Sequence, residues 1–254
     1  MQRWIQQLER HRARISAKYP DEPLMMLMDI DGTFFDVRHA IRHLLELYDR
    51  THGAAHFAPV MDLVENVNPT MPMETALAAL LLYTNIPESE RLIALSWFRK
   101  RCSTYEVLLK LHQPCEGVFE IVQAIASQPR TEVGFNSSRP EFLRGETLRA
   151  LNSLAIDYGL QFRGDQLYMD SGSWVGNAPF VKVSGLKHFQ NKGYRIFAAL
   201  DSEPANLDAI WAADTHREIM TLSTEGVLSA YHDTVKLRAA HIDALARRQS
   251  LVTQ

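Results

Sequence analysis

Residues 24–35 decide the fold of this chain, and they read Leu24-Met25-Met26-Leu27-Met28-Asp29-Ile30-Asp31-Gly32-Thr33-Phe34-Phe35. Five apolar residues lead directly into two aspartates that stand two positions apart, and Gly-Thr follows at once. An unbroken apolar run of this length is typical of a strand that is buried on both faces, as in a parallel sheet covered by helices. The stretch therefore predicts a central parallel strand that ends in two carboxylates.

The position of the two aspartates indicates a ligand site. Open α/β sheets bind their ligands outside the carboxyl ends of the strands. Asp29 and Asp31 lie at that end, and the chain must turn at Gly32. We therefore expect two carboxylates and a flexible backbone to gather at one place, although the turn frees the two side chains from pointing the same way.

Composition excludes several classes of protein. The chain has 254 residues, a formal net charge of −3 and a pI of about 6.4, so no basic excess points to a nucleic-acid partner. Its two cysteines, Cys102 and Cys115, form no CxxC pair, which argues against a zinc site or a disulfide framework and fits a reducing cytosol. No apolar stretch approaches the roughly 18 residues of a membrane span, and the N-terminus lacks the apolar core of a signal peptide. We expect a cytoplasmic protein with neither a membrane nor a nucleic-acid partner.

The segment between the first strand and Pro114 is predicted to be helical. Apolar residues recur at helical spacing over residues 37–50, and further helices are expected over residues 73–83 and 88–111, the last with a break near Cys102 as an option. One helix suffices to connect two parallel strands, so this many residues indicate an inserted helical domain. The predicted domains are an N-terminal helical extension (1–20), a helical cap (37–113) and an α/β core (21–36 with 114–254).

The rest of the core alternates between helices and strands. We expect helices over residues 117–126, 143–158, 184–191, 205–213 and 232–248. A short strand that breaks into a polar turn is expected over 131–140, loops with one or two short strands over 160–181, a buried strand over 194–200 and an edge strand over 218–222. This alternation predicts an α/β fold with a doubly wound, mainly parallel sheet.

Polar side chains gather at two further strand ends and before one helix. They are Asn136, Ser137 and Ser138 after the second strand, Asp201 and Glu203 after a later strand, and Lys182 before the helix between them. Because the carboxyl ends of parallel strands share one edge of the sheet, we expect these groups to join Asp29 and Asp31.

The ordered set resembles the haloacid dehalogenase (HAD) superfamily, whose members are mostly Mg²⁺-dependent phosphatases. Its first motif is DxDGT, which residues 29–33 match, and its second is a Ser or Thr that ends the second core strand, matched by Ser137. The third motif is a Lys that opens a helix, matched by Lys182, and the fourth is one or more acids that end a later strand, matched by Asp201. The insert after the first motif stands where this superfamily places a helical cap.

The resemblance implies a role for each residue. Asp29 would be the nucleophile and Asp31 the general acid and base, while Ser137 and Lys182 would hold phosphoryl oxygens. Mg²⁺, which prefers oxygen ligands, would be bound by Asp29, by the backbone carbonyl of Asp31 and by Asp201. The remaining substrate-binding residues would be Gly32, Thr33, Asn136, Ser138 and Arg139.

Two motif placements have alternatives. Asn136 takes the place of Ser137 if the strand ends one residue earlier; we prefer Ser137, because Ser-Ser-Arg then parallels the Thr-Gly-Arg of many HAD proteins. Lys187 competes with Lys182, which we prefer because it directly precedes the predicted helix, whereas Lys187 falls inside it.

Three further residues have open roles. Arg139 either reaches the substrate phosphate or caps the turn at the surface. The stretch Asp201-Ser202-Glu203-Pro204-Ala205-Asn206 departs from the common DDxxxD and GDxxND patterns. Glu203 or Asn206 either holds a metal-bound water or orients Lys182, or simply caps the next helix.

We therefore expect hydrolysis of a small phosphomonoester with Mg²⁺ as cofactor, through an aspartyl-phosphate intermediate. Asp31 argues against a dehalogenase, which lacks this second aspartate. The alternatives are a phosphomutase of the same superfamily and a non-catalytic HAD-fold protein that binds a phosphorylated ligand or a partner. A Rossmann or P-loop nucleotide module is excluded, because no GxGxxG or GxxxxGK[ST] follows a strand. The expected partner is a small phosphorylated metabolite, and the oligomeric state is left open.

Overall fold

The fold is given by a computed structural model, which describes residues 2–68, 71, 73–102, 104–108, 113–172 and 177–228. The predicted final helix over residues 232–248 lies outside these residues. Within them, no helix has the length and apolar character that a membrane span requires.

Five strands form one parallel sheet in the order β3-β2-β1-β4-β5. The strands are β1 (Leu24–Met28), β2 (Thr131–Pro140), β3 (Leu167–Asp170), β4 (Arg195–Asp201) and β5 (Met220–Ser223). The apolar run β1 is central, because it pairs with β2 on one side and β4 on the other. The predicted α/β class with a parallel sheet is therefore confirmed, and the last strand lies at an edge as expected.

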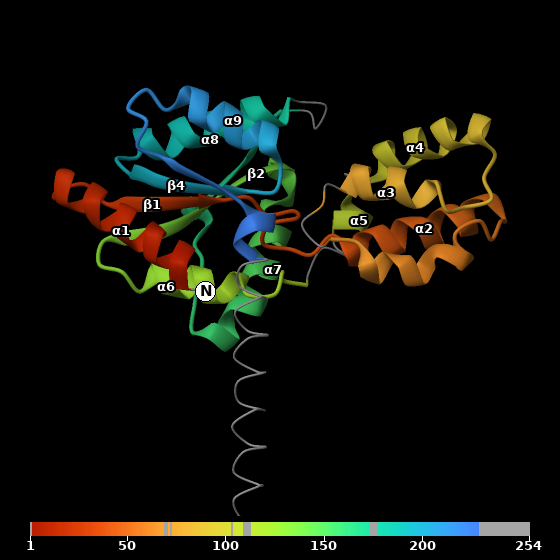
Figure 1. The fold of residues 1–254 in the computed structure, drawn as a ribbon, viewed down its shortest axis with the longest axis horizontal. Coiled ribbons are helices and arrows are strands. Elements are labelled where there is room, and N and C mark those ends of the chain that lie inside the picture. The colour runs from red at the N-terminus through yellow and green to blue at the C-terminus, as the bar shows by residue number, and fades with distance from the viewer. Residues whose placement is uncertain are drawn as a thin grey trace, which may run out of the picture.

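Helices cover both faces of this sheet. The α-helices are α1 (Gln2–Lys18), α2 (Arg38–His52), α3 (Met73–Leu81), α4 (Glu88–Cys102), α5 (Tyr105–Leu108), α6 (Val118–Ala126), α7 (Arg144–Ala155), α8 (Ala178–Asn191) and α9 (Pro204–Ala213). Short 3₁₀-helices are η1 (Ala58–Asn66), η2 (Glu141–Leu143), η3 (Ile156–Tyr158) and η4 (Gly164–Gln166). Figure 1 shows α8 and α9 on one face of the sheet and α1, α6 and α7 on the other.

The apolar run of β1 is continuous because both of its faces are buried. Met25 and Leu27 pack into a cluster with Leu186 of α8 and Ile210 of α9. The alternate residues of the strand, such as Met26, join the larger cluster on the opposite face. All five residues of β1 are buried, which places the aspartates that follow at a fixed point of the core.

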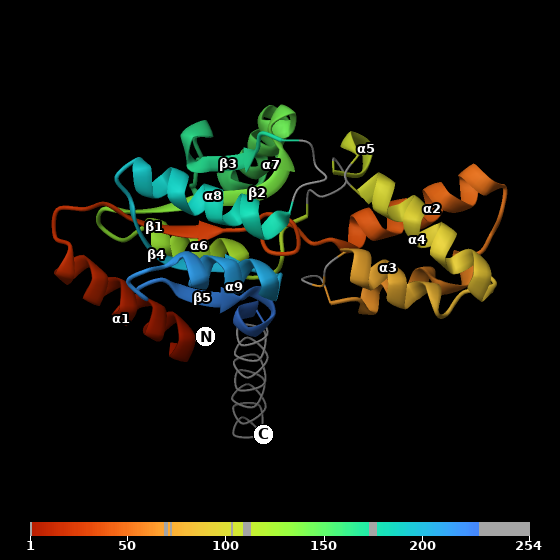
Figure 2. The same cartoon turned by 90° about the horizontal axis from the view of Figure 1, so that it is seen from above.

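The chain between β1 and β2 forms a group of helices, α2 to α5 with η1. This group stands beside the sheet (Figures 1 and 2). The described residues from 38 to 108 contain no strand. Two chain segments connect the group to the core and pair with each other, because Phe35 bridges Pro114 and the Asp36 N–H donates to the Gln113 carbonyl at 2.8 Å. The carboxyl ends of the strands point toward the helical group (Figure 1).

Two elements differ from the sequence-based expectation. Helix α8 begins at Ala178 instead of the expected residue 184. Pro179 lies in its first turn, where a helix tolerates proline. Strand β2 continues to Pro140 instead of breaking into a turn, with a register irregularity between Asn136 and Pro140. The expected helix over 88–111 takes the broken form, because α4 ends at Cys102.

Candidate active site

Two strands and one helix bring charged groups together at the carboxyl edge of the sheet. Asp29 follows β1 and Asp201 ends β4, and the ammonium group of Lys182 on α8 lies between them. Lys182 Nζ forms an ion pair with Asp29 Oδ1 and lies 3.0 Å from Asp201 Oδ2. Only 1–8 % of each of these residues is exposed, so this is a buried, three-membered charge cluster.

Lys182 is held by a reciprocal contact with β2. Its ammonium donates to the Asn136 carbonyl at 2.5 Å, and the Asn136 side-chain amide donates to the Lys182 carbonyl at 2.8 Å. Lys182 lies inside α8, so the expectation that it directly precedes the helix is wrong. Lys187 is exposed, and the structure brings Lys182 to the aspartates.

Gly185 makes the contact between α8 and β2 possible. A Cβ atom at this position would lie 2.1 Å from Asn136 Oδ1 and 2.7 Å from Tyr168 Cδ1. Only a glycine lets the helix approach the strand closely enough for the Asn136 amide to reach the Lys182 carbonyl. The amide of Asn136 therefore lies against the backbone of α8.

Burial sets the proton affinities of this cluster. Desolvation raises the pKa of Asp29 to about 7, and the neighbouring Lys182 ammonium partly offsets this rise. Burial opposes the charge of Lys182, but the Asp201 and Asp29 carboxylates outweigh it and raise the pKa of the ammonium above its usual value. Lys182 therefore stays cationic beside the two carboxylates.

Asp31 forms a second ion pair at the same edge. Both of its carboxylate oxygens accept hydrogen bonds from the Arg139 guanidinium, at 2.6 to 3.1 Å. Arg139 also donates to Thr147 Oγ1 at 3.2 Å and lies over the ring of Phe35. The Arg139 side chain is only 3 % exposed, whereas that of Asp31 is 27 % exposed. Arg139 is therefore the buried partner of an accessible carboxylate, and the alternative that it caps a turn at the surface is wrong.

The hydroxyl groups of β2 surround these charges. Ser137 is buried, and its Oγ accepts a hydrogen bond from the Arg139 N–H at 3.1 Å. Among the described residues, Ser138 Oγ is buried without a hydrogen-bond partner. A buried hydroxyl without a partner is uncommon, so Ser138 has hydrogen-bonding capacity to spare.

The loop after β1 supports Asp29. Thr33 Oγ1 lies 3.4 Å from Asp29 Oδ2 and 2.9 Å from Thr224 Oγ1. Gly32 has a φ of 75°, which glycine adopts without strain. The chain turns here as predicted, and the turn separates Asp29 from Asp31.

The last strand end is organised around Asp201. Its Oδ1 accepts hydrogen bonds from the Glu203 N–H at 2.9 Å and the Asn206 Nδ2 at 3.0 Å. Asn206 is buried, so it orients Asp201 and thereby Lys182. Glu203 stands at the start of α9 without a side-chain cap bond, and burial raises its pKa.

The donor set at this edge fits a magnesium ion. The described residues contain no group of three or more His, Cys, Asp or Glu side chains placed to hold a metal. Mg²⁺ in phosphate sites is usually held by only one or two carboxylates, with the other positions left to phosphate and water. Asp29 and Asp201 supply two carboxylates, and the Asp31 carbonyl, which accepts from Ser202 Oγ at 3.4 Å, supplies a further oxygen.

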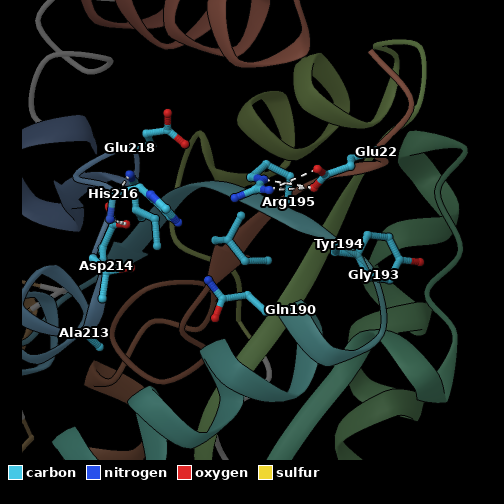
Figure 3. Close-up of a pocket in the computed structure, with 12 residues that line it drawn as sticks. Glu22, Gln190, Gly193, Tyr194, Arg195, Ala213, Asp214, His216 and Glu218 are labelled. Carbon is cyan, nitrogen blue, oxygen red and sulfur yellow. Dashed lines mark hydrogen bonds and ion pairs between the residues drawn. The ribbon is translucent and has the colours of Figure 1, made fainter. Parts of the chain in front are cut away.

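A separate cavity of about 280 Å³ lies at the opposite, amino ends of β4 and β5 (Figure 3). The Glu22–Arg195 ion pair lies in its wall, and Asp214 and Glu218 also line it. None of the predicted site residues contributes to its walls. Glu22 pairs with Arg195, Glu218 pairs with Lys18, and Asp214 accepts from the N–H groups of His216 and Ile219, so these charges are engaged within the chain.

Comparisons with known proteins add little to this geometry. No protein-family model matches the chain, and no curated protein sequence matches it. Among solved structures, a provisionally assigned beta-phosphoglucomutase from Thermotoga maritima is 16 % identical, with a TM-score of 0.40, over 83 % of this chain and 99 % of that one. A likeness of this size supports no conclusion about chemistry, so we base the functional proposal on the side chains themselves.

The sequence analysis did not predict which residues form hydrogen bonds with the charged and hydroxyl side chains of the site. The bonds of Arg139 to Asp31 and Thr147, and that of Thr33 to Thr224, join residues whose spacing in the sequence carries no signal. The only usable sign was Arg139 itself, which directly follows the predicted second motif.

Proposed function

We propose that this protein hydrolyses a small phosphomonoester with Mg²⁺ as cofactor, through a phosphoryl intermediate on Asp29. The observation that carries the proposal is the buried cluster in which Lys182 lies between Asp29 and Asp201. Two carboxylates and one ammonium at the carboxyl edge of a parallel sheet stand where such folds bind ligands. This arrangement supports the proposal of phosphoryl transfer at this edge.

The charges of the site explain why a metal ion is required. Three carboxylates (Asp29, Asp31 and Asp201) face two cationic side chains (Lys182 and Arg139). The remaining negative charge repels a phosphomonoester dianion. Asp29, Asp201 and the Asp31 carbonyl would hold Mg²⁺. The positive charge of the ion would offset this repulsion and would stabilise the negative charge that develops on the phosphoryl oxygens.

In the first step, a carboxylate oxygen of Asp29 forms a bond to phosphorus while the bond from phosphorus to the ester oxygen breaks. Asp31, an ion-paired carboxylate in the described geometry, must first take up a proton from solvent, and it then gives that proton to the leaving oxygen, so the alcohol departs neutral. Lys182 and the Ser137 hydroxyl stabilise the charge on the phosphoryl oxygens. Asp29 needs its ionised form for this attack, so activity falls as the pH drops below the range in which it ionises.

In the second step, water attacks phosphorus and the bond to Asp29 breaks. Asp31 now accepts the proton of that water, which returns both carboxyl groups to their starting state. Arg139 occupies both oxygens of Asp31 in the described geometry. The Arg139 contact must therefore loosen in each proton transfer. We assign Ser138 Oγ, which has no hydrogen-bond partner among the described residues, to a phosphoryl oxygen.

The test is release of inorganic phosphate from para-nitrophenyl phosphate and from a panel of metabolite phosphates, with Mg²⁺ and with EDTA. We expect release that depends on Mg²⁺ and that falls about 10²- to 10⁴-fold in Asp31→Asn, the usual contribution of a general acid and base. Isomerised sugar phosphate without phosphate release would indicate a mutase. Binding of a phosphate mimic without either product would indicate a non-catalytic protein.

A further inference from the structure

Helix α4 presents an apolar stripe to solvent. Leu92 and Ile93 are 75 % and 67 % exposed, which is unusual for large aliphatic side chains next to each other. Ser89 and Ser96 are also exposed, and with Leu92 and Ile93 they follow the spacing i, i+3, i+4, i+7. This spacing places the four side chains on one face of the helix, which we call the α4 outer face.

The opposite face of the same helix is already used. Ala94 and Phe98 are fully buried, and the Phe98 ring packs against Tyr48 and Phe57 of the helical group. The helix is thus apolar on two sides, one of which packs within the chain and one of which does not. A helix with apolar residues on both sides is typical of one that packs against neighbours on both.

More apolar surface lies at the adjoining end of α3. Leu82 and Tyr83, which follow its last residue, are 65 % and 70 % exposed. A short loop connects them to the start of α4. Tyr83 lines a pocket with Leu63 and Leu80, so Leu92 and Ile93 are the adjacent exposed pair that indicates an interaction surface on α4.

The charges of α4 select the partner. The first turn of the helix is acidic, with Glu88 and Glu90, and its last turn is basic, with Arg99, Lys100 and Arg101. This order also stabilises a single helix through its dipole, but the dipole does not account for the exposed Leu92 and Ile93. A second α4 that runs antiparallel brings the acidic end of each copy against the basic end of the other.

We propose that the α4 outer face binds the same face of a second copy of this chain, in a two-fold symmetric dimer with antiparallel α4 helices. The centre of the stripe then lies on the symmetry axis, which sets Leu92 and Ile93 of one copy against the same two residues of the second copy. Glu88 and Arg99 lie on the same flank of the stripe by helical geometry, so Glu88 approaches Arg99 of the partner subunit. Such a self-complementary surface is what a two-fold interface requires.

The existing contact of Arg99 does not prevent this pairing. Arg99 binds Glu74 of its own chain at 2.5 Å, but both side chains are more than half exposed. An exposed pair of this kind contributes little, and a guanidinium has donors enough for two carboxylates.

The first test is the oligomeric state of the full chain by sedimentation velocity over a range of concentrations. We expect a dimer whose dissociation constant rises about tenfold or more in Ile93→Glu, because a charge then lies at the interface centre. Ile156→Glu is the matched control, since Ile156 is 72 % exposed on the core, and it should leave the dimer unchanged. A monomeric wild type, or a dimer that Ile93→Glu does not weaken, would overturn the proposal.

The second test uses charge reversal to establish the antiparallel direction. Glu88→Arg and Arg99→Glu should each weaken the dimer several-fold, because each places like charges opposite one another. The double variant restores opposite charges in both symmetry-related pairs and should return the dissociation constant toward that of the wild type. Failure of the double variant to recover, with folding intact by circular dichroism, would contradict the antiparallel pairing.

Discussion

The side-chain amide of Asn136 donates to the Lys182 carbonyl at 2.8 Å while the Lys182 ammonium donates to the Asn136 carbonyl at 2.5 Å. This reciprocal pair fixes α8 to β2 at the residue whose ammonium lies between Asp29 and Asp201. The amide therefore acts on the site through the position of Lys182.

Asn136→Ala tests this positioning role. We predict a loss of about 1–3 kcal/mol in the free energy of unfolding, because the buried Lys182 carbonyl loses a partner, and a lower kcat with little change in KM. Asn152→Ala is the matched control: its amide makes two hydrogen bonds to the Phe162 backbone, away from Lys182. It should lose similar stability and keep its kcat. Equal kcat values for the two variants would show that Asn136 has only a structural role.

Gly185→Ala tests the close approach of α8 to β2. The added Cβ would overlap Asn136 Oδ1 at 2.1 Å, so we predict a loss of about 1–3 kcal/mol from overpacking. Gly145→Ala, within α7, meets no atom within 4 Å and should instead gain about 0.4–1 kcal/mol. Chemical denaturation of the two variants gives the comparison, and a stabilised Gly185→Ala would mean that the helix has room to move.

Arg139→Gln removes a buried partner of Asp31. We predict a loss of about 1–3 kcal/mol in the free energy of unfolding, because Arg139 bonds Asp31 and Thr147 in a buried position. Arg149→Gln, which breaks an exposed ion pair with Glu146, should change stability by less than about 1 kcal/mol. Equal midpoints in urea for the two variants would contradict a structural role for the buried pair.

The two thiols should be unreactive in the folded protein. Burial raises the pKa of Cys102 to about 12, and burial also raises the pKa of Cys115 well above its usual value. The thiolate is the reactive form, so both groups stay protonated at pH 8, and Cys115, which is buried, reacts with dithionitrobenzoate only as the chain unfolds. Cys102 is partly buried and should react slowly in the folded protein. Rapid reaction of Cys115 in native buffer would contradict its burial.

The sequence predicted the elements whose signal is local. The apolar run from Leu24 to Met28 identified the central strand. The polar residues at strand ends identified Asp29 and Asp201 as neighbours, and Lys182 was expected to join them from the start of a helix. These predictions succeed because the carboxyl ends of parallel strands must share an edge. The assignment of catalytic roles and of the domain boundaries stays a prediction.

Features that depend on distant residues were not predictable. The start of α8 was placed six residues too late, because residues 160–181 were expected to form loops and short strands, whereas the helix begins at Ala178 with its proline in the first turn. The Arg139–Asp31 pair joins residues 108 positions apart, and no local pattern specifies such a contact. The need for Gly185 appears only once Asn136 and α8 are seen together.

The central claim is that Asp29 is the nucleophile of a Mg²⁺-dependent phosphatase, and the most direct measurement compares phosphate release by the wild type, Asp29→Asn and Asp157→Asn. Asp157 is an exposed aspartate away from the site, so its variant controls for the substitution itself. We predict that Asp29→Asn abolishes Mg²⁺-dependent release while Asp157→Asn keeps it. Release by Asp29→Asn at the wild-type rate would contradict the assignment of Asp29.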